Sequence, residues 1–182
     1  MAVTALSAST GATAWSDAFT PPCAISAEVP AISGGTVYAG WSGGIVAISL
    51  DSGAIVWDNQ AVGTGFDPLS VTRTEVIGSP RPDPGYSYPL IALSRTDGSV
   101  LWRSTSKLDE TMGATFGGLT WALGYKPGTG NARVVAFNAG NGDQVFATAP
   151  FSDDVQSDPP VVQAGRVYVN TRTALECLAL PA

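Results

Sequence analysis

The sequence predicts an all-β fold, a β-propeller built from four-stranded antiparallel blades, with almost no helix. The first observation is a repeat. A stretch that opens on Ala, carries Gly six residues later and closes on an aromatic residue occurs at 5–15, 47–57, 92–102 and 136–146. The second is that short runs rich in Val, Ile, Tyr and Trp dominate the chain, bounded by Gly, Asp, Asn or Pro. No apolar stripe of helical period extends over three turns.

The spacing of the repeats defines the blade. The repeat glycines are Gly11, Gly53, Gly98 and Gly142, which lie 42, 45 and 44 residues apart. Periods of roughly 20–50 residues are typical of arrays and propellers, in which a unit must pack against its neighbours to bury its faces. The last three glycines follow Ser, Asp and Asn, a pairing that suits the positive φ of a tight hairpin turn. We therefore expect about four blades per chain.

Each full unit divides into four strands. The predicted strands are 27–33, 36–42, 45–50 and 54–60 in the first full unit, 67–73, 74–79, 88–94 and 99–105 in the next, and 112–118, 119–125, 133–139 and 143–149 in the third. Residues 1–182 are thus a single propeller or propeller fragment, with half a blade at 1–19, full blades at 20–62, 63–107 and 108–150, and a partial closing blade at 151–182.

The two ends of the chain carry complementary parts of a blade. The first unit begins at a third strand, whereas the last aligns with the first three strands of a unit, with Gly165 on Gly35 and Cys177 on Ala47. Three arrangements are open: a self-closed ring of four blades, two chains joined head to tail into eight blades, or a stretch of a longer propeller. A disulfide between Cys23 and Cys177 is possible in the self-closed ring, whereas an open arc would hold the two far apart.

Composition and charge exclude several functional classes. The 9 basic side chains are scattered and the net charge is −6, which argues against nucleic-acid binding. The chain has no histidine, so His-dependent zinc sites and Ser-His catalytic triads are excluded. No apolar run is long enough for a membrane span, and residues 1–10 lack the pattern of a secretory signal peptide.

The repeated stretch resembles the tryptophan-docking motif of PQQ-like β-propellers, the repeat of quinoprotein alcohol dehydrogenases. Trp15, Trp57 and Trp102 match the docking tryptophan, and Phe146 departs from it while keeping an aromatic ring. In that family the ring wedges between neighbouring blades, and the Ala and Gly of the motif leave room for it. The resemblance covers nearly the whole chain. It implies a ring of about eight blades, which favours the two-chain ring or the fragment, and a periplasmic or extracellular location.

The resemblance implies two classes of function. We interpret the chain as a non-catalytic repeat domain that acts as a scaffold for a protein partner or a small polar ligand, because it has no adjacent cysteine pair and no segment that matches the family's cofactor-binding residues. The alternative is a fragment or half-ring of a dehydrogenase that uses PQQ with calcium. No catalytic or metal-ligating residue is assigned, and a homodimer completing an eight-bladed ring is possible.

Any ligand is expected on the face formed by the loops between second and third strands and between successive blades. The candidate residues on this face are Tyr86, Tyr88, Asp109, Glu110, Asp153 and Asp154. Ordinary solvated loops are the alternative interpretation, and the carboxylate pairs lack the alternating spacing of a calcium loop. Trp41 and Trp121, on predicted second strands, are interpreted as sheet core rather than as stacking surfaces.

Overall fold

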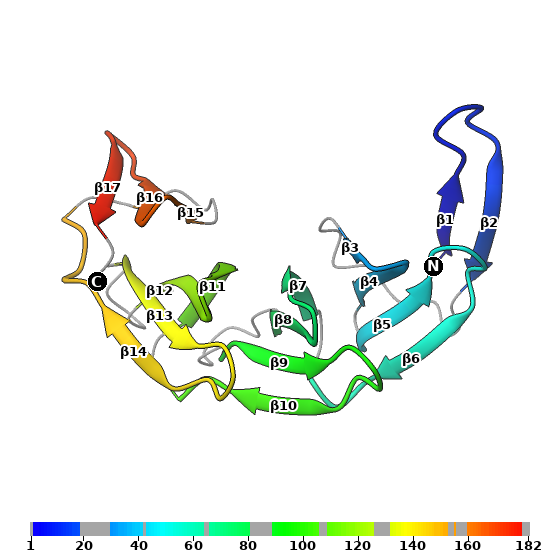
Figure 1. Cartoon of the computed structure of the whole chain (residues 1–182), viewed down its shortest axis with the longest axis horizontal. Coiled ribbons are helices and arrows are strands. Elements are labelled where there is room, and N and C mark those ends of the chain that lie inside the picture. The colour runs from blue at the N-terminus through cyan, green and yellow to red at the C-terminus, as the bar shows by residue number, and fades with distance from the viewer. Residues whose placement is uncertain are drawn as a thin grey trace.

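The computed structural model of the chain is an open arc of five antiparallel sheets (Figure 1). The structure describes residues 2–18, 30–41, 43–63, 66–80, 89–105, 109–125, 132–152, 155 and 160–179. All the regular elements among these residues are strands, so the predicted all-β fold of four-stranded antiparallel blades is confirmed. In this part of the chain, no helical segment has the length and apolar character needed to span a membrane.

We number the sheets as blades along the chain. Blade 1 is the pair β1 (Ala2–Leu6) and β2 (Thr13–Ala18). Blade 2 contains β3 (Ala31–Ser33), β4 (Thr36–Trp41), β5 (Gly44–Ser49) and β6 (Ile55–Asn59). Blade 3 contains β7 (Phe66–Val71), β8 (Glu75–Pro80), β9 (Ile91–Ser94) and β10 (Val100–Arg103). Blade 4 contains β11 (Asp109–Phe116), β12 (Leu119–Tyr125), β13 (Ala132–Asn138) and β14 (Gln144–Ala147). Blade 5 contains β15 (Val161–Gln163), β16 (Arg166–Asn170) and β17 (Leu175–Ala179).

The outer hairpin of blades 1 to 4 has one recurring design. In blade 2 the Gly53 amide donates to the carbonyl of Ser49 at 2.9 Å, and the same bond recurs at Gly11, Gly98 and Gly142. All four glycines have φ between 70° and 75°, a conformation that Gly adopts without the steric cost that a Cβ imposes. A register shift beside the repeat Ala, as between Ala47 and Ile48, recurs in blades 1 to 4. Such bulges bend the strand and increase its local twist.

The hydrophobic core lies between the blades rather than inside any one of them. One cluster joins Tyr38, Ile45 and Trp57 of blade 2 to Ile91 and Leu93 of blade 3. Comparable clusters join blade 3 to blade 4, blade 4 to blade 5, and blade 1 to blade 2. Since each sheet buries its apolar side chains against its neighbours, the stability of a blade depends on the blades beside it.

The arc does not close on itself. Blade 1 and blade 5 stand at its two opposite ends, with an open gap between them (Figure 1). The arrangement in which one chain closes into four blades is therefore wrong for this structure. Cys177 is a free, exposed thiol on β17, and Cys23 lies outside the described residues.

Candidate functional site

The predicted ligand face is only partly described by the structure. Tyr86, Tyr88, Asp153 and Asp154 lie outside the described residues. Asp109 and Glu110 begin β11, where their backbones pair with Tyr125 and Gly124 of β12. The side chains of these two acids are not described, so the ligand role of all six candidates stays a prediction.

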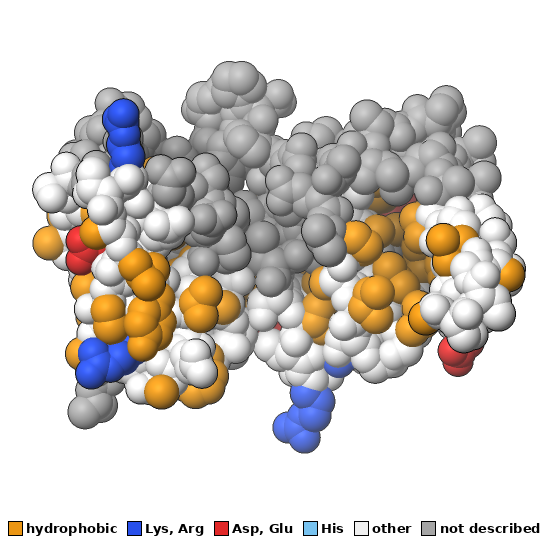
Figure 2. Space-filling view, turned by 90° about the horizontal axis from the view of Figure 1, so that it is seen from above, with side chains coloured by type: hydrophobic (Ala, Val, Ile, Leu, Met, Phe, Trp, Pro, Cys, Tyr) orange, Lys and Arg blue, Asp and Glu red, His pale blue; other side chains and the backbone are white. Residues whose placement is uncertain are grey.

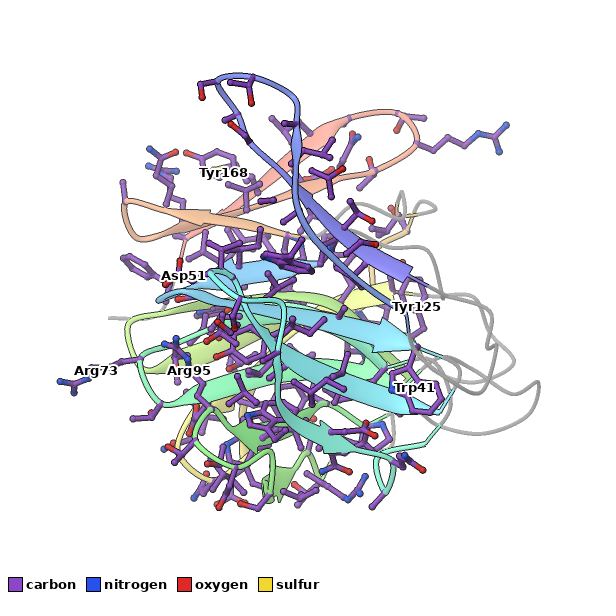
Figure 3. All side chains as sticks on the ribbon, turned by 90° about the vertical axis from the view of Figure 1, so that its right-hand side faces the viewer. Trp41, Asp51, Arg73, Arg95, Tyr125 and Tyr168 are labelled. Carbon is purple, nitrogen blue, oxygen red and sulfur yellow. The ribbon has the colours of Figure 1, made fainter. Side chains whose placement is uncertain are left out.

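Two aromatic side chains, Trp41 and Tyr125, lie on the same side of the arc (Figure 3). Trp41 and Tyr125, which end β4 and β12, lie on the same side of the molecule, and Asp51, Arg73, Arg95 and Tyr168 lie on the other (Figure 3). Trp41 is half-buried and its ring covers Gly43, so that a Cβ on that glycine would collide with it. Within the described ranges, no group of three or more His, Cys, Asp or Glu residues is placed to hold a metal ion.

Trp121 belongs to the core rather than to a surface. It is 1% exposed and packs in the cluster between blades 4 and 5. Among the described residues its indole Nε1 has no hydrogen-bond partner, which costs about 1–3 kcal/mol of desolvation. The ring of Phe146 lies against it, with a centroid distance of 5.7 Å.

The tightest repeated contacts are those between an aromatic ring and the next blade. The indole NH of Trp15 donates to the carbonyl of Leu50 at 2.6 Å, that of Trp57 to Arg95 at 2.9 Å, and that of Trp102 to Ala139 at 2.7 Å. Each acceptor lies three residues before a repeat glycine, in the turn of the following blade. We call each ring with its turn a dock.

Each dock depends on the missing side chain of its glycine. A Cβ on Gly53 would lie 2.8 Å from the ring of Trp15, and one on Gly98 would lie 2.5 Å from the ring of Trp57. Real Cβ atoms essentially never approach so closely, so the indole occupies the space that a side chain would need. The docks therefore connect neighbouring blades, and the aromatic rings fill the space over the glycines so that no ligand fits there.

Phe146 and Gly11 have no dock within the described residues. Phe146 lacks the NH that the three tryptophans use, and of the described glycines none has the Phe146 ring among its nearest neighbours. Gly11 has no atom within 4 Å of a Cβ built on it, although its φ of 70° matches the φ of the docked glycines.

Arg95 forms a second kind of link between blades 2 and 3. Its Nε donates to the Tyr38 hydroxyl at 2.9 Å, and Nη2 donates to the carbonyl of Ser33 at 3.0 Å, both in blade 2. Nη1 donates to the carbonyls of Thr72 at 2.9 Å and Arg73 at 3.2 Å in blade 3. The guanidinium carbon lies 5.8 Å from the Tyr38 ring centroid, within range of a cation–π contact. Leu50 and Ala139 stand at this position in blades 2 and 4, so the motif did not predict this link.

Titratable groups are shifted by local contacts. Two hydrogen bonds from Ser99, one from its backbone amide and one from its hydroxyl, lower the pKa of Asp97 in the turn before β10. Burial raises the pKa of Glu75 at the start of β8. The hydrogen bonds that lower the pKa of Asp97 come from its own hairpin.

The docks predict a specific effect of glycine substitution. Gly98→Ala should lower the free energy of unfolding by about 1–3 kcal/mol more than Gly35→Ala, because overpacking against Trp57 is added to the backbone strain. Gly35 is a matched control, since its φ of 76° is close to the 72° of Gly98 and nothing lies within 4 Å of its Cβ position. Urea unfolding of both variants measures the difference. If both variants lost the same free energy of unfolding, the Trp57 ring would not be in tight contact with Gly98.

The comparisons with known proteins agree on the fold. The chain matches the family model described as outer membrane protein assembly factor BamB over residues 1–81 and 89–180. Among solved structures, the crystal structure of BamB from Moraxella catarrhalis is 18% identical, with a TM-score of 0.52 over 98% of this chain and 67% of that one. No curated protein sequence matches the chain.

Two designed proteins have a similar fold. The computationally designed Ika4 protein is 13% identical, with a TM-score of 0.65 over 84% of this chain and 89% of that one. The computationally designed Ika8 protein is 12% identical, with a TM-score of 0.66 over 83% of this chain and 45% of that one. The family model, the repeat and the docks together show that this chain belongs to the PQQ-like β-propeller repeat family described as outer membrane protein assembly factor BamB.

Proposed function

We propose that this chain is a non-catalytic scaffold that binds another protein. The family to which it belongs is described as an assembly factor for outer membrane proteins, and a protein-binding role in the periplasm or outside the cell is consistent with that description. No catalytic residue and no resident cofactor form part of this proposal.

The observation that carries the proposal is the outer rim of the arc. The strands β6, β10 and β14 are the last strands of their sheets, so each has one unpaired edge. These strands expose large apolar side chains by 39–54% of their surface: Ile55, Val56, Val100, Leu101 and Val145. Proteins protect such edges with charged side chains, Pro, bulges or short strands. These three strands are short and bulged but contain neither Lys nor Pro.

The rim fits an extended segment of a partner protein. An added strand would satisfy the free backbone groups of an outer edge, and alternate apolar side chains of that strand would cover the exposed Val and Leu side chains. The second candidate, a half-ring of a dehydrogenase that uses PQQ with calcium, rests on the resemblance to quinoproteins alone.

Two measurements test the proposal. A photo-crosslinking residue at Val100 should capture one protein in the source cells, whereas the same residue at Thr96, in the exposed turn before β10, should not. The captured protein is then purified, and its affinity for the chain is measured. The Leu101→Lys variant should bind it about tenfold or more weakly, because the lysine places a charge in an apolar contact. Binding unaffected by Leu101→Lys would contradict the rim as the site. Saturable binding of PQQ in the presence of calcium, followed by its absorbance, would favour the dehydrogenase.

A further inference from the structure

We propose that Arg133, near the start of β13, binds the carboxylate group of a ligand, which is either a small organic acid or an acidic side chain of another protein. The site lies between blades 3 and 4, on the side of the arc where Trp41 and Tyr125 lie (Figure 3). It shares no residue with the outer rim, so this proposal and the scaffold function at the rim stand or fail separately.

Arg133 breaks a repeat position that is otherwise uncharged. It lies three residues before the repeat Ala of blade 4, where blades 1, 2 and 3 have Ala2, Gly44 and Pro89. The repeat itself therefore does not need a long basic side chain at this position. A residue that departs from a local rule of the fold in this way is expected at a functional site.

The side chain of Arg133 faces blade 3. Side chains alternate along a strand, and Val135 and Phe137, two and four residues further along β13, belong to the cluster that joins blade 4 to blade 3. Arg133 continues this row toward the end of the sheet, where it is half-buried. Its guanidinium group is thus held at the edge of an apolar core.

This end of the sheet is the face on which the loops between second and third strands predict a ligand. Ala132, the residue before Arg133, pairs with Tyr125 at the end of β12. Tyr125 lies on the same side of the arc as Trp41, opposite the side that holds Arg95 (Figure 3). Arg133 is therefore placed on the predicted ligand face.

The guanidinium group of Arg133 has no partner in the described part of the chain. Its Nε is buried and donates no hydrogen bond, and no described residue accepts one from Nη1 or Nη2. A buried donor without an acceptor is destabilising, and more so when it is charged. Arg95 is the contrast, since all three of its nitrogen atoms donate hydrogen bonds. Arg133 thus offers an unused planar fork of donors, which matches the two oxygens of a carboxylate.

The residues next to Arg133 do not compete for its donors. Gly124 pairs directly with Arg133 on β12, so no side chain stands beside the guanidinium in that row. On blade 3, Ser79 lies two residues after Ile77 on the same side of β8, and is 8% exposed. Its hydroxyl donates to the carbonyl of Pro80 at 3.3 Å, a long bond for a hydroxyl. Ser79 is a second donor at this end of the facing sheet.

The charges around Arg133 favour a carboxylate over a phosphate. The strands β8, β9 and β12 contain no Lys or Arg, and Figure 2 shows the basic side chains scattered rather than gathered in one patch. A phosphate group carries about −1.5 to −2 charges at neutral pH, which one guanidinium does not balance on a chain of net charge −6. A carboxylate carries a single charge and accepts two parallel hydrogen bonds from one arginine.

The first test follows the guanidinium NH signals of Arg133 by NMR of the isotope-labelled chain. They are assigned as the signals that disappear in Arg133→Lys. Sodium acetate should move them downfield, with saturation in the millimolar range, because the carboxylate accepts hydrogen bonds from unused donors. Sodium chloride at the same ionic strength and uncharged acetamide should not. Signals that acetate moves no further than chloride does would overturn the proposal.

A second test separates binding from a structural role. Acetate should raise the urea midpoint of the wild type above its value in chloride, because a ligand that binds the folded chain stabilises it. Arg133→Met should abolish this rise and, without acetate, should not lower the midpoint, since no described hydrogen bond is lost. Arg103→Met is the matched control for charge, because Arg103 is exposed on β10 of blade 3, and it should keep the rise. An equal rise in wild type and Arg133→Met, or a midpoint lowered by Arg133→Met alone, would overturn the site.

The source of the carboxylate is distinguished by repeating the NMR titration with an acetylated tripeptide amide that has one central glutamate. A peptide that binds about tenfold or more tightly than acetate would support the site and assign it to an acidic side chain of another protein. Acetate that binds at least as tightly as the peptide would support the site and assign it to a small organic acid. A peptide whose glutamine analogue moves the signals equally would contradict recognition of the carboxylate.

Discussion

Trp57→Ala is expected to lower the free energy of unfolding by about 3–5 kcal/mol, the range of large core truncations. The side chain is 7% exposed, donates from its indole NH to the carbonyl of Arg95, and fills the space above Gly98. Alanine would leave a cavity between blades 2 and 3 and an unsatisfied carbonyl. Urea unfolding followed by circular dichroism measures the loss, since the variant removes a fluorescent reporter.

Trp57→Phe separates packing from hydrogen bonding in the same dock. It keeps a ring but loses the NH, so the expected loss is about 1 kcal/mol from the hydrogen bond plus a small packing term. Phe146, which already holds this position in blade 4, shows that the fold accepts such a ring. If Trp57→Ala cost less than about 1 kcal/mol, the ring would not be wedged between the blades.

Arg95→Met is expected to lower the free energy of unfolding by about 2–3 kcal/mol. Methionine keeps most of the stem but removes all the guanidinium hydrogen bonds, which are worth about 1.5–3 kcal/mol each when fully formed and less where solvent reaches the group. The change uncouples Ser33 and Tyr38 of blade 2 from Thr72 of blade 3.

Arg73→Met is the control for the change in net charge. Arg73 is exposed and its side chain extends away from the body of the molecule (Figure 3). The free energy of unfolding of this variant should therefore lie within about 0.5 kcal/mol of the wild-type value. Arg95→Lys should recover less than half of the loss, because a single ammonium cannot reach both blades as the planar fork does. Equal stability of the two Met variants would show that Arg95 does not link the blades.

The candidate site was less predictable than the fold. Loop lengths indicated a ligand face, but its named acids and tyrosines are spread over separate segments of the chain, and Asp109 and Glu110 begin strand β11 instead of lying in a loop. No local pattern says which of these residues meet. The Arg95 link was missed because its partners lie far from it in the sequence, on strands β3 and β4 of blade 2 and in the β7–β8 turn of blade 3. A signal was present in the sequence. Arg95 occupies the repeat position that Leu50 and Ala139 occupy in the neighbouring blades. A charged residue that breaks an otherwise apolar repeat position indicates a specific interaction at that position.

The sequence by itself determined the blade, its four-strand pattern and its outer turn. These features depend on residues close together in the chain: alternating apolar side chains, a glycine at positive φ and a bulge beside the repeat Ala. The tertiary structure alone decided that the arc stays open, that Leu6 and Ile32 are exposed, and that Phe146 packs against Trp121 of its own blade rather than on a repeat glycine among the described residues. The reason is that closure depends on the small rotation between successive blades, which adds up along the arc and comes from contacts between distant residues.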